Sequence, residues 1–402
     1  MDNRDTRLYF LDWIRICAFF VLILYHTGMY YVTWDFHIKS PSASDTIEPL
    51  MMMSGPWRLG LLFLVSGVAA AFLLQKLGSA RFLRQRSARL LLPLIFGMLV
   101  VVPPQPYLEV VEKMAYQGSY LDFMKLYLSN YQGFCKAGSC LDLPTWNHLW
   151  FVTYLWVYTL LLAALVAALG ANWQRLSDTI ARTLTGWKLL VLPVAILAAA
   201  RVALYSRYPS THDLVNDWYN HAQYVPLFML GALLAKQRAV WQRMDAMRFA
   251  ALGLALGCWA TLMAYYALVD NLNPADIVLL TEIQRVVYAL LQWSAMLAVF
   301  GFGHHHLQFD SAKRRYLAQA VFPVYIVHQT LIIVFAHVMQ PARMPPLTEG
   351  LILVVLTVTF SFGIFEAVRR VPLLRACFGI TTNAAATSQT SAHAAQGLAR
   401  TA

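Results

Sequence analysis

The sequence predicts an all-α membrane protein with about ten transmembrane helices and with both termini in the cytoplasm. Of its 402 residues, 59% are hydrophobic and only 13% are charged, roughly half the charged fraction of a soluble domain. The hydrophobic residues gather in long runs, most of them near the ~20 residues that a bilayer requires. No removable signal peptide is expected, because no small-residue cleavage site follows the first apolar run.

The predicted spans follow one another along nearly the whole chain. Ten apolar runs can each form a helix, at residues 10–31, 56–74, 90–103, 148–170, 187–205, 222–236, 248–268, 282–302, 316–339 and 349–368. Pro93 and Pro226 indicate kinks or caps in the two short runs. Residues 1–378 are therefore predicted to form one transmembrane domain. Residues 379–402, rich in Ala, Ser, Thr and Gln, are predicted to be a disordered cytoplasmic tail.

The basic residues indicate the orientation of the chain in the membrane. The net charge of +11 does not point to nucleic acid, because lysines and arginines form no single patch but recur in alternate connections, such as 76–89 and 313–315. Basic connections lie on the cytoplasmic side. Two outer connections are long, at 32–55 and 104–147, and the second is expected to hold a short helix near 120–129. No internal duplication of the kind found in many transporters is evident.

The five cysteines predict no disulfide scaffold and no metal site. Cys135 and Cys140 fall together in the second outer connection, where they either close a small disulfide or remain free thiols. No second Cys or His pair at zinc spacing accompanies them. The tract 304–306, three histidines, is interpreted as a solvated loop.

Arg15 and His26 are the most informative residues of the first span. Eleven residues make about three helical turns, so on a helix both lie on one face, roughly 16 Å apart. Ionisable groups at membrane depth are costly and usually serve a function. A histidine suits proton transfer at neutral pH, although packing against another helix is the alternative. Asp12 precedes Arg15 by one turn, and the two are expected to pair.

A second pair of ionisable residues precedes the third span. Arg86 and Arg89 are one turn apart, so both point to one side of a helix. Arginine is well suited to bind phosphate, and the alternative is ordinary positive-inside topology. Ser66 and Gly67 interrupt another apolar run, where small residues predict close helix packing.

Taken together, these segments resemble the acyltransferase-3 family of integral membrane proteins, in particular a branch associated with glucan biosynthesis. The likeness rests on pieces that occur in family order: Tyr9–Arg15 with His26, Trp34 with His37 and Ser40, Leu62–Gly67, Arg86 with Arg89 before Pro93, His148–Phe151, and Tyr325 with His328. Val68 departs from the family pattern, which has an aromatic residue after Ser-Gly. The long second outer connection, with its own cysteines, is another departure.

The resemblance implies a multi-pass enzyme of the bacterial inner membrane that uses cytosolic acyl-CoA, either acetyl-CoA or succinyl-CoA. The acceptor would be a hydroxyl of a carbohydrate such as a periplasmic glucan, and no metal is expected. By this likeness His26 is the general base, joined by Arg15 and Asp12 in the catalytic group. Arg15, Arg86 and Arg89 would bind the donor. Direct transfer and an acyl-histidine intermediate both remain open.

Four further residues are predicted to contact the carbohydrate: Trp34, His37, His148 and His328. Two other functions fit a polytopic protein with buried charges. One is an exporter of a glycan intermediate, and the other is a sensor or scaffold subunit in which the polar residues are structural. The expected partners are the lipid bilayer and the carbohydrate, and the sequence does not define an oligomeric state.

Overall fold

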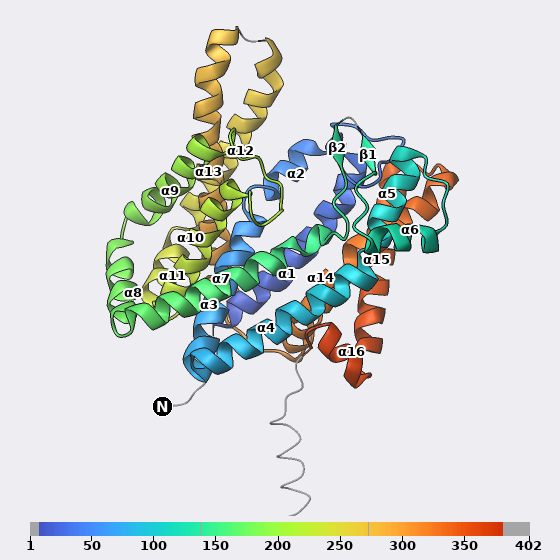
Figure 1. Ribbon diagram of the computed structural model, residues 1–402. Helices are drawn as coiled ribbons and strands as arrows, with labels where there is room; N and C mark the ends of the chain where they lie inside the picture. Colours follow the sequence, from blue (N-terminus) through green and yellow to red (C-terminus); the bar gives the residue numbers. More distant parts are fainter. Residues whose placement is uncertain (1–7, 137, 272, 381–402) are drawn as a thin grey trace, which may run out of the picture.

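The computed structural model describes residues 8–136, 138–271 and 273–380. The prediction of an all-α protein is confirmed (Figure 1), and the strands β1 and β2 within these ranges are two residues long and pair antiparallel. Most of the predicted tail, from residue 381 onward, lies outside the described residues. Ile380 still packs against the hydrophobic core.

All ten predicted apolar runs are helical, and short helices join them. The elements are α1 (Tyr9–Tyr31), α2 (Glu48–Ser54), α3 (Arg58–Leu77), α4 (Ser79–Phe96), α5 (Pro104–Met114), α6 (Tyr120–Leu128), β1 (Cys135–Lys136), β2 (Ser139–Cys140), α7 (Trp150–Leu169), α8 (Asn172–Thr183), α9 (Lys188–Leu204), α10 (Trp218–Leu234), α11 (Arg238–Ala246), α12 (Arg248–Leu268), α13 (Pro274–His306), α14 (Ala312–Met339), α15 (Pro346–Val368) and α16 (Pro372–Cys377).

Eight helical segments in the described ranges are long and apolar enough to cross a membrane. A ninth is possible if α8 and α9, which meet at a bend of 109°, count as one span. The remaining apolar run forms α10, which has 17 residues and contains Pro226. The protein is therefore a multi-pass membrane protein.

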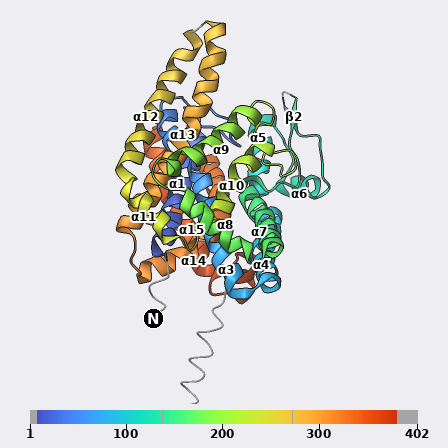
Figure 2. The same ribbon diagram turned by 90° about the vertical axis from the view of Figure 1, so that its left-hand side faces the viewer.

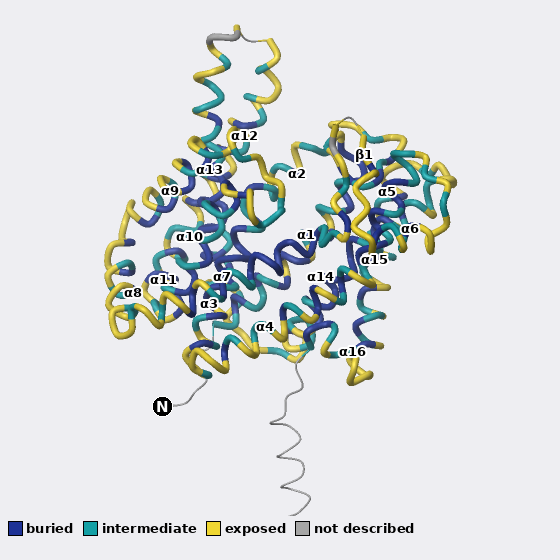
Figure 3. Tube along the Cα trace, viewed as in Figure 1, coloured by how far each residue is buried: buried dark blue, intermediate teal, exposed yellow. Residues whose placement is uncertain are grey.

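Helix α1 lies in the middle of the bundle. It packs against α14, α13, α15 and α3, and both views place it behind or between these helices (Figures 1 and 2). Burial follows the same arrangement, because buried positions concentrate along α1 and α14 while α8 is largely exposed (Figure 3). The helix that carries Arg15 and His26 is thus enclosed by protein along much of its length.

Close packing of α3 against α10 depends on two glycines. A Cβ atom on Gly67 would collide with the carbonyl oxygen of Phe228, and one on Gly231 would collide with that of Leu64. Each helix therefore presents a glycine to the backbone of the other, as small residues do where membrane helices approach closely. The packing role predicted for Gly67 is confirmed.

The connection 104–147 is more ordered than expected. The predicted short helix is present as α6, whose N-cap Ser119 accepts a hydrogen bond from the Asp122 amide. However, residues 104–114 are helical rather than part of a loop. Proline is tolerated in the first turn of a helix, so Pro104 and Pro106 begin α5 instead of ending the preceding helix, which continues through a π-helical turn at Gly97–Val101.

The predicted inner and outer connections gather at opposite ends of the molecule. The starts of α1 and α4 and the helix α16 lie at the lower end in Figure 1, whereas α2, the two strands, α5 and α6 lie at the upper end. Cys135 and Cys140 form a disulfide at the upper end, which resolves the alternatives left by the sequence. Which end faces the cytoplasm remains a prediction from the charge pattern.

Candidate active site

Two of the cavities among the described residues flank the middle of the bundle and contain most of the predicted site residues. The larger, of about 600 Å³, is lined by His26, His37, His148 and His212 and is called here the histidine cavity. The smaller, of about 260 Å³, is lined by Arg15, Arg86 and Arg89 and is called the arginine cavity. Helix α1 contributes to both, so its predicted polar face spans from one cavity to the other.

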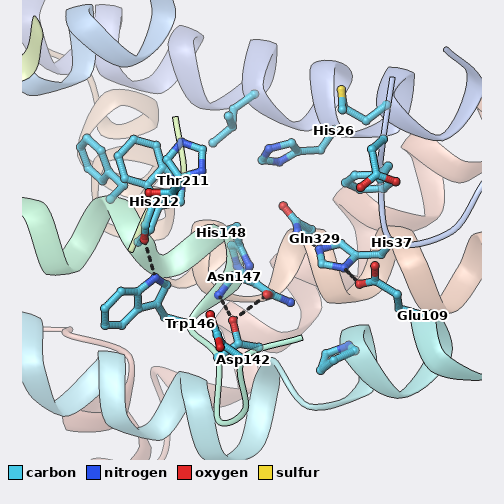
Figure 4. Close-up of a pocket in the computed structure, with 18 of the residues that line it drawn as sticks. His26, His37, Glu109, Asp142, Trp146, Asn147, His148, Thr211, His212 and Gln329 are labelled. Atoms are coloured by element: carbon cyan, nitrogen blue, oxygen red, sulfur yellow. Dashed lines mark hydrogen bonds and ion pairs between the residues drawn. The ribbon is translucent and has the colours of Figure 1, made fainter. Parts of the chain in front are cut away.

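Several elements build the histidine cavity. Helices α1, α3, α5, α7 and α14 form its walls, and the segments that follow β2 and α9 cover it. Figure 4 shows His26 facing the same space as His37 and Gln329, with Asp142, Asn147 and Thr211 on other sides. The covering segments come from connections rather than spans, and they supply polar groups that apolar spans lack.

His26 is paired with another histidine. Its Nδ1 atom lies 2.8 Å from Nε2 of His328, and the two rings stack with their centroids 5.0 Å apart. The other ring nitrogen of His328, Nδ1, lies 2.6 Å from the carbonyl oxygen of Tyr325. His328 is fully buried and does not line the histidine cavity. It lies behind His26, which does line the cavity.

The Tyr325 carbonyl determines how protons are placed on both rings. A carbonyl oxygen only accepts, so Nδ1 of His328 must donate. In neutral His328 the Nε2 atom is then the acceptor, and His26 donates to it from Nδ1. The remaining nitrogen of neutral His26, Nε2, therefore keeps its lone pair. This series of hydrogen bonds leaves neutral His26 with one unprotonated nitrogen, which a general base requires.

His148 has both ring nitrogens occupied by the protein. Nε2 donates to the carbonyl oxygen of Ile326 at 3.0 Å, so Nδ1 is left to accept from the amide of Gln105, at 3.3 Å. Its backbone carbonyl accepts a hydrogen bond from the Tyr325 hydroxyl. His148 thus fastens α14 to the start of α7 and shapes the wall of the cavity.

His37 belongs to a network of charged and amide groups. Its Nδ1 lies 2.6 Å from Glu109, and its Nε2 lies 3.1 Å from the amide nitrogen of Gln329. Lys113 pairs with Glu109 at 3.0 Å and with Asp35 at 2.8 Å. The carboxylates of Glu109 and Asp35 on this side of the cavity therefore both form ion pairs with Lys113.

Aromatic surfaces line the opposite side of the cavity. The His212 ring stacks on Trp150 at 4.1 Å, and its backbone carbonyl accepts from the Trp146 indole at 2.9 Å. Burial lowers the pKa of His212, against the opposing effect of Asp217. A neutral imidazole beside two indoles makes a flat, mostly uncharged wall.

The arginine cavity contains individual guanidinium nitrogens that lack protein partners among the described residues. Nε and one terminal nitrogen of Arg86 are buried and have no hydrogen-bond partner among the described residues, and the same holds for Nε of Arg15. Arg89 lines the same cavity and is exposed. Buried guanidinium nitrogens without partners are costly, and an anionic ligand would satisfy them.

A thin wall separates the two cavities. Leu62, Phe151 and Tyr325 line both of them. Tyr325 also fixes His328 through its carbonyl oxygen. A ligand that extends from one cavity to the other must therefore pass beside these three side chains.

The structure separates the predicted site residues into three groups. His26, His37 and His148 line the histidine cavity, and Arg15, Arg86 and Arg89 line the arginine cavity. Neither cavity includes the remaining three, Trp34, His328 and Asp12, among its described lining residues.

Asp12 lies at the end of α1 away from His26. The predicted pair with Arg15 is present at 3.4 Å, but Asp12 also pairs with Arg314. Arg314 is fully buried and also binds Asp310 at 2.7 Å. Asp12 therefore joins α1 to α14, and the structure gives it a structural contact that the sequence did not predict.

Other polar groups escaped prediction from the sequence. Arg58, Gln105, Glu109, Thr211, His212 and Gln329 line the cavity or support its lining. Gln105 and Gln329 carried a usable signal, because each is an amide within or beside an apolar run.

The histidines of 304–306 lie in the last turn of α13 rather than in a loop, and His304 contacts Asp245. Within the described ranges, no cluster of three His, Cys, Asp or Glu side chains could hold a metal ion.

The fold defines a multi-pass membrane protein with two cavities on either side of a shared wall, and comparison with known proteins supplies the family. Residues 8–366 match the acyltransferase-3 family, described as an acyltransferase domain. The chain belongs to this family and is an acyltransferase, so the prediction of an enzyme is confirmed.

Relatives of known name extend over nearly the whole chain. It is 24% identical to glucans biosynthesis protein C of Escherichia coli K12 over 382 residues, which cover 92% of this chain and 94% of the relative. The proteins of the same name from E. coli strains 536 and HS share the same identity and coverage. No solved structure matches the chain.

Proposed function

We propose that the protein transfers an acyl group from acyl-CoA to a hydroxyl of a carbohydrate, with His26 as the general base. The observation that carries this proposal is the chain from the Tyr325 carbonyl through His328 to His26, because it leaves His26 Nε2 unprotonated. The donor class is acetyl-CoA or succinyl-CoA. The acceptor class follows from the relatives named for glucan biosynthesis, and the location is a bacterial inner membrane.

The arginine cavity suits the nucleotide end of the donor. Coenzyme A carries several phosphate charges, and guanidinium groups bind phosphate through paired hydrogen bonds. The buried nitrogens of Arg86 and Arg15 that lack protein partners would gain them from these oxygens. The charge pattern of the connections supports a cytoplasmic opening for this cavity.

The histidine cavity suits the sugar. Its volume of about 600 Å³ lies within the usual range of small-molecule sites. The Trp146 ring offers a flat face for a sugar ring, and Asp142, Asn147 and Thr211 offer hydrogen bonds to hydroxyl groups. Of the predicted sugar contacts, His37 is the one we propose to bind the sugar, because it lines the cavity and belongs to a polar network.

In the proposed reaction the thioester lies beside the wall formed by Leu62, Phe151 and Tyr325. The acceptor hydroxyl gives its proton to His26 Nε2 as its oxygen attacks the thioester carbonyl. The carbon–sulfur bond then breaks, and the sulfur leaves as coenzyme A thiol after taking the proton back from His26. An acyl-histidine intermediate would use the same nitrogen as a nucleophile.

Thiol release by the purified protein tests the proposal. Wild type, His26→Gln and His337→Gln are compared in detergent with acetyl-CoA and succinyl-CoA, with and without a glucan. His337 contacts Glu112 outside both cavities and serves as the control. We expect acceptor-dependent release by wild type and the control and a loss of about 10²–10⁴-fold in His26→Gln. A wild-type protein that consumes neither donor, or a His26→Gln protein as active as wild type, would contradict the proposal.

A further inference from the structure

Arg58 is a cation in the histidine cavity that the proposed roles leave unused. It is the first residue of α3, lines the cavity, and has only 6% of its surface exposed. Two of its guanidinium nitrogens, Nε and one terminal nitrogen, are buried and have no hydrogen-bond partner among the described residues. Such a group is costly to bury unless an anion compensates it.

Aromatic stacking holds the Arg58 guanidinium in place. Its central carbon lies 3.2 Å from the centre of the Tyr25 ring. A cation over an aromatic face is stabilised by the ring, but the ring accepts no strong hydrogen bonds from the guanidinium edge. The edge therefore remains available for an oxygen atom.

Lys113, a second cation near this cavity, is already neutralised. Lys113 pairs with two carboxylates, those of Glu109 and Asp35. The described residues offer Arg58 no comparable carboxylate at ion-pair distance. The phosphates of the donor do not supply one in the proposed complex, because Arg86 and Arg89 bind them beyond the wall. A charge on the reacting groups is the remaining source.

Arg58 lies close enough to His26 to act on the same reacting group. The Tyr25 ring centre is 3.2 Å from the Arg58 guanidinium carbon and 6.2 Å from the His26 ring centre. The guanidinium is therefore less than about 10 Å from the imidazole. When a hydroxyl attacks a carbonyl, one hydrogen bond of about 3 Å can run from the hydroxyl to the imidazole and another from the carbonyl oxygen to the guanidinium. The two bonds and the reacting atoms between them span roughly 7–9 Å. His26 and Arg58 can therefore contact the same carbonyl group under attack.

We propose that Arg58 stabilises the oxyanion that forms when the acceptor hydroxyl attacks the thioester. This inference rests on the proposed function and adds a second catalytic residue to it. As the new carbon–oxygen bond forms, the hydroxyl proton moves to His26 and the carbonyl π electrons move to the oxygen, which the Arg58 edge then binds. When the carbonyl re-forms, the carbon–sulfur bond breaks and the thiolate takes the proton from His26.

Kinetics of Arg58 variants test this assignment, with Arg201→Gln as the matched control. Arg201 is equally buried, at 6% exposure, and is also stacked on tyrosines, but it does not line the histidine cavity. Wild type, His26→Gln, Arg58→Gln, Arg58→Lys and Arg201→Gln are assayed with both donors. Tm and coenzyme A binding are measured for each to verify folding.

The expected result is a fall in kcat of about 10²–10³-fold for Arg58→Gln, as for loss of an oxyanion donor. KM for donor and acceptor should change less than about threefold, and the loss should be the same with acetyl-CoA and succinyl-CoA. Arg58→Lys should retain an intermediate kcat, since it keeps the charge without the planar fork.

Three results would overturn the inference. One is an Arg58→Gln protein as active as the Arg201→Gln control. Another is a loss seen only with succinyl-CoA, which would make Arg58 a reader of the acyl carboxylate. The third is a loss confined to the acceptor KM, which would assign Arg58 to an anionic acceptor. If wild type itself consumes no donor, the proposed function fails first and the inference fails with it.

Discussion

Nδ1 of His26 lies 2.8 Å from Nε2 of His328, a residue 302 positions later in the chain. This contact joins α1 to α14 in the middle of the bundle. Because the Tyr325 carbonyl lies behind it, we propose that His328 is a positioning residue rather than the predicted sugar contact. Its proposed task resembles that of the third member of a nucleophile–base–orienting triad, which holds an imidazole in the useful tautomer.

Replacing His328 should lower kcat without affecting donor binding. His328→Leu removes the acceptor of the His26 Nδ1 proton, so His26 can protonate at Nε2 instead and lose its function as a base. We expect a fall in kcat of about 100-fold with a donor KM close to that of wild type. His328→Asn can accept through its side-chain oxygen and should retain more activity than His328→Leu. Equal activities of these two variants in steady-state kinetics would argue against positioning.

Replacing Arg86 should weaken donor binding. Hydrogen bonds to charged groups contribute about 1.5–3 kcal/mol each, so Arg86→Gln should raise the donor KM roughly 10- to 150-fold with little change in kcat at saturation. Arg84→Gln is the control, because Arg84 is exposed on the same helix and lines neither cavity. Isothermal titration with coenzyme A provides a second measurement. If the Arg86 and Arg84 variants bind coenzyme A with equal affinity, Arg86 does not bind the donor and serves only to orient the chain in the membrane.

Enlarging Leu62 should block passage between the cavities. Leu62 is 3% exposed and lines both of them, so Leu62→Trp should displace the thioester arm from its path. Small displacements of reacting groups can cost about 10²-fold in rate, and a loss of at least tenfold is expected. Coenzyme A binding should persist, since the phosphates do not reach the wall. Leu62→Met keeps the volume and should turn over normally, and a fully active Leu62→Trp protein would show that the acyl group takes another route.

Acid should weaken the contacts that Asp310, in the connection before α14, makes with the first turn of that helix. The hydrogen bond from Arg314, supported by Arg315, holds the pKa of Asp310 below its ordinary value despite some burial. A lowered carboxyl pKa contributes stability that is complete above the unfolded pKa, about 4, and is lost as pH falls through the folded value. Asp310→Asn should therefore lower Tm at pH 6, and its difference from wild type should shrink below pH 4. A difference that is independent of pH would show that the charge of Asp310 contributes nothing.

The sequence predicted the class of the fold because the signals of a membrane helix are local. Each run of apolar residues carries its own indication of length and burial, and all ten runs are helical. Helix α5 was predicted as a loop, since Pro104 and Pro106 usually signal the end of a helix from sequence alone. Whether a proline ends one helix or begins another depends on the geometry of the preceding turn, here the π-helical turn at Gly97–Val101.

The predicted site divides in the same way. Arg15 and His26 lie on one face of one helix, so helical periodicity was sufficient to relate them, and the same is true of Arg86 and Arg89. The sequence by itself thus determined a histidine within a membrane helix and a set of arginines. Only the tertiary structure decided that His328 contacts His26, that Asp12 pairs with Arg314, and that Arg58 lines the histidine cavity. Those contacts depend on how α1 packs against α14 and α3, and no local pattern specifies the relative placement of helices far apart in the chain.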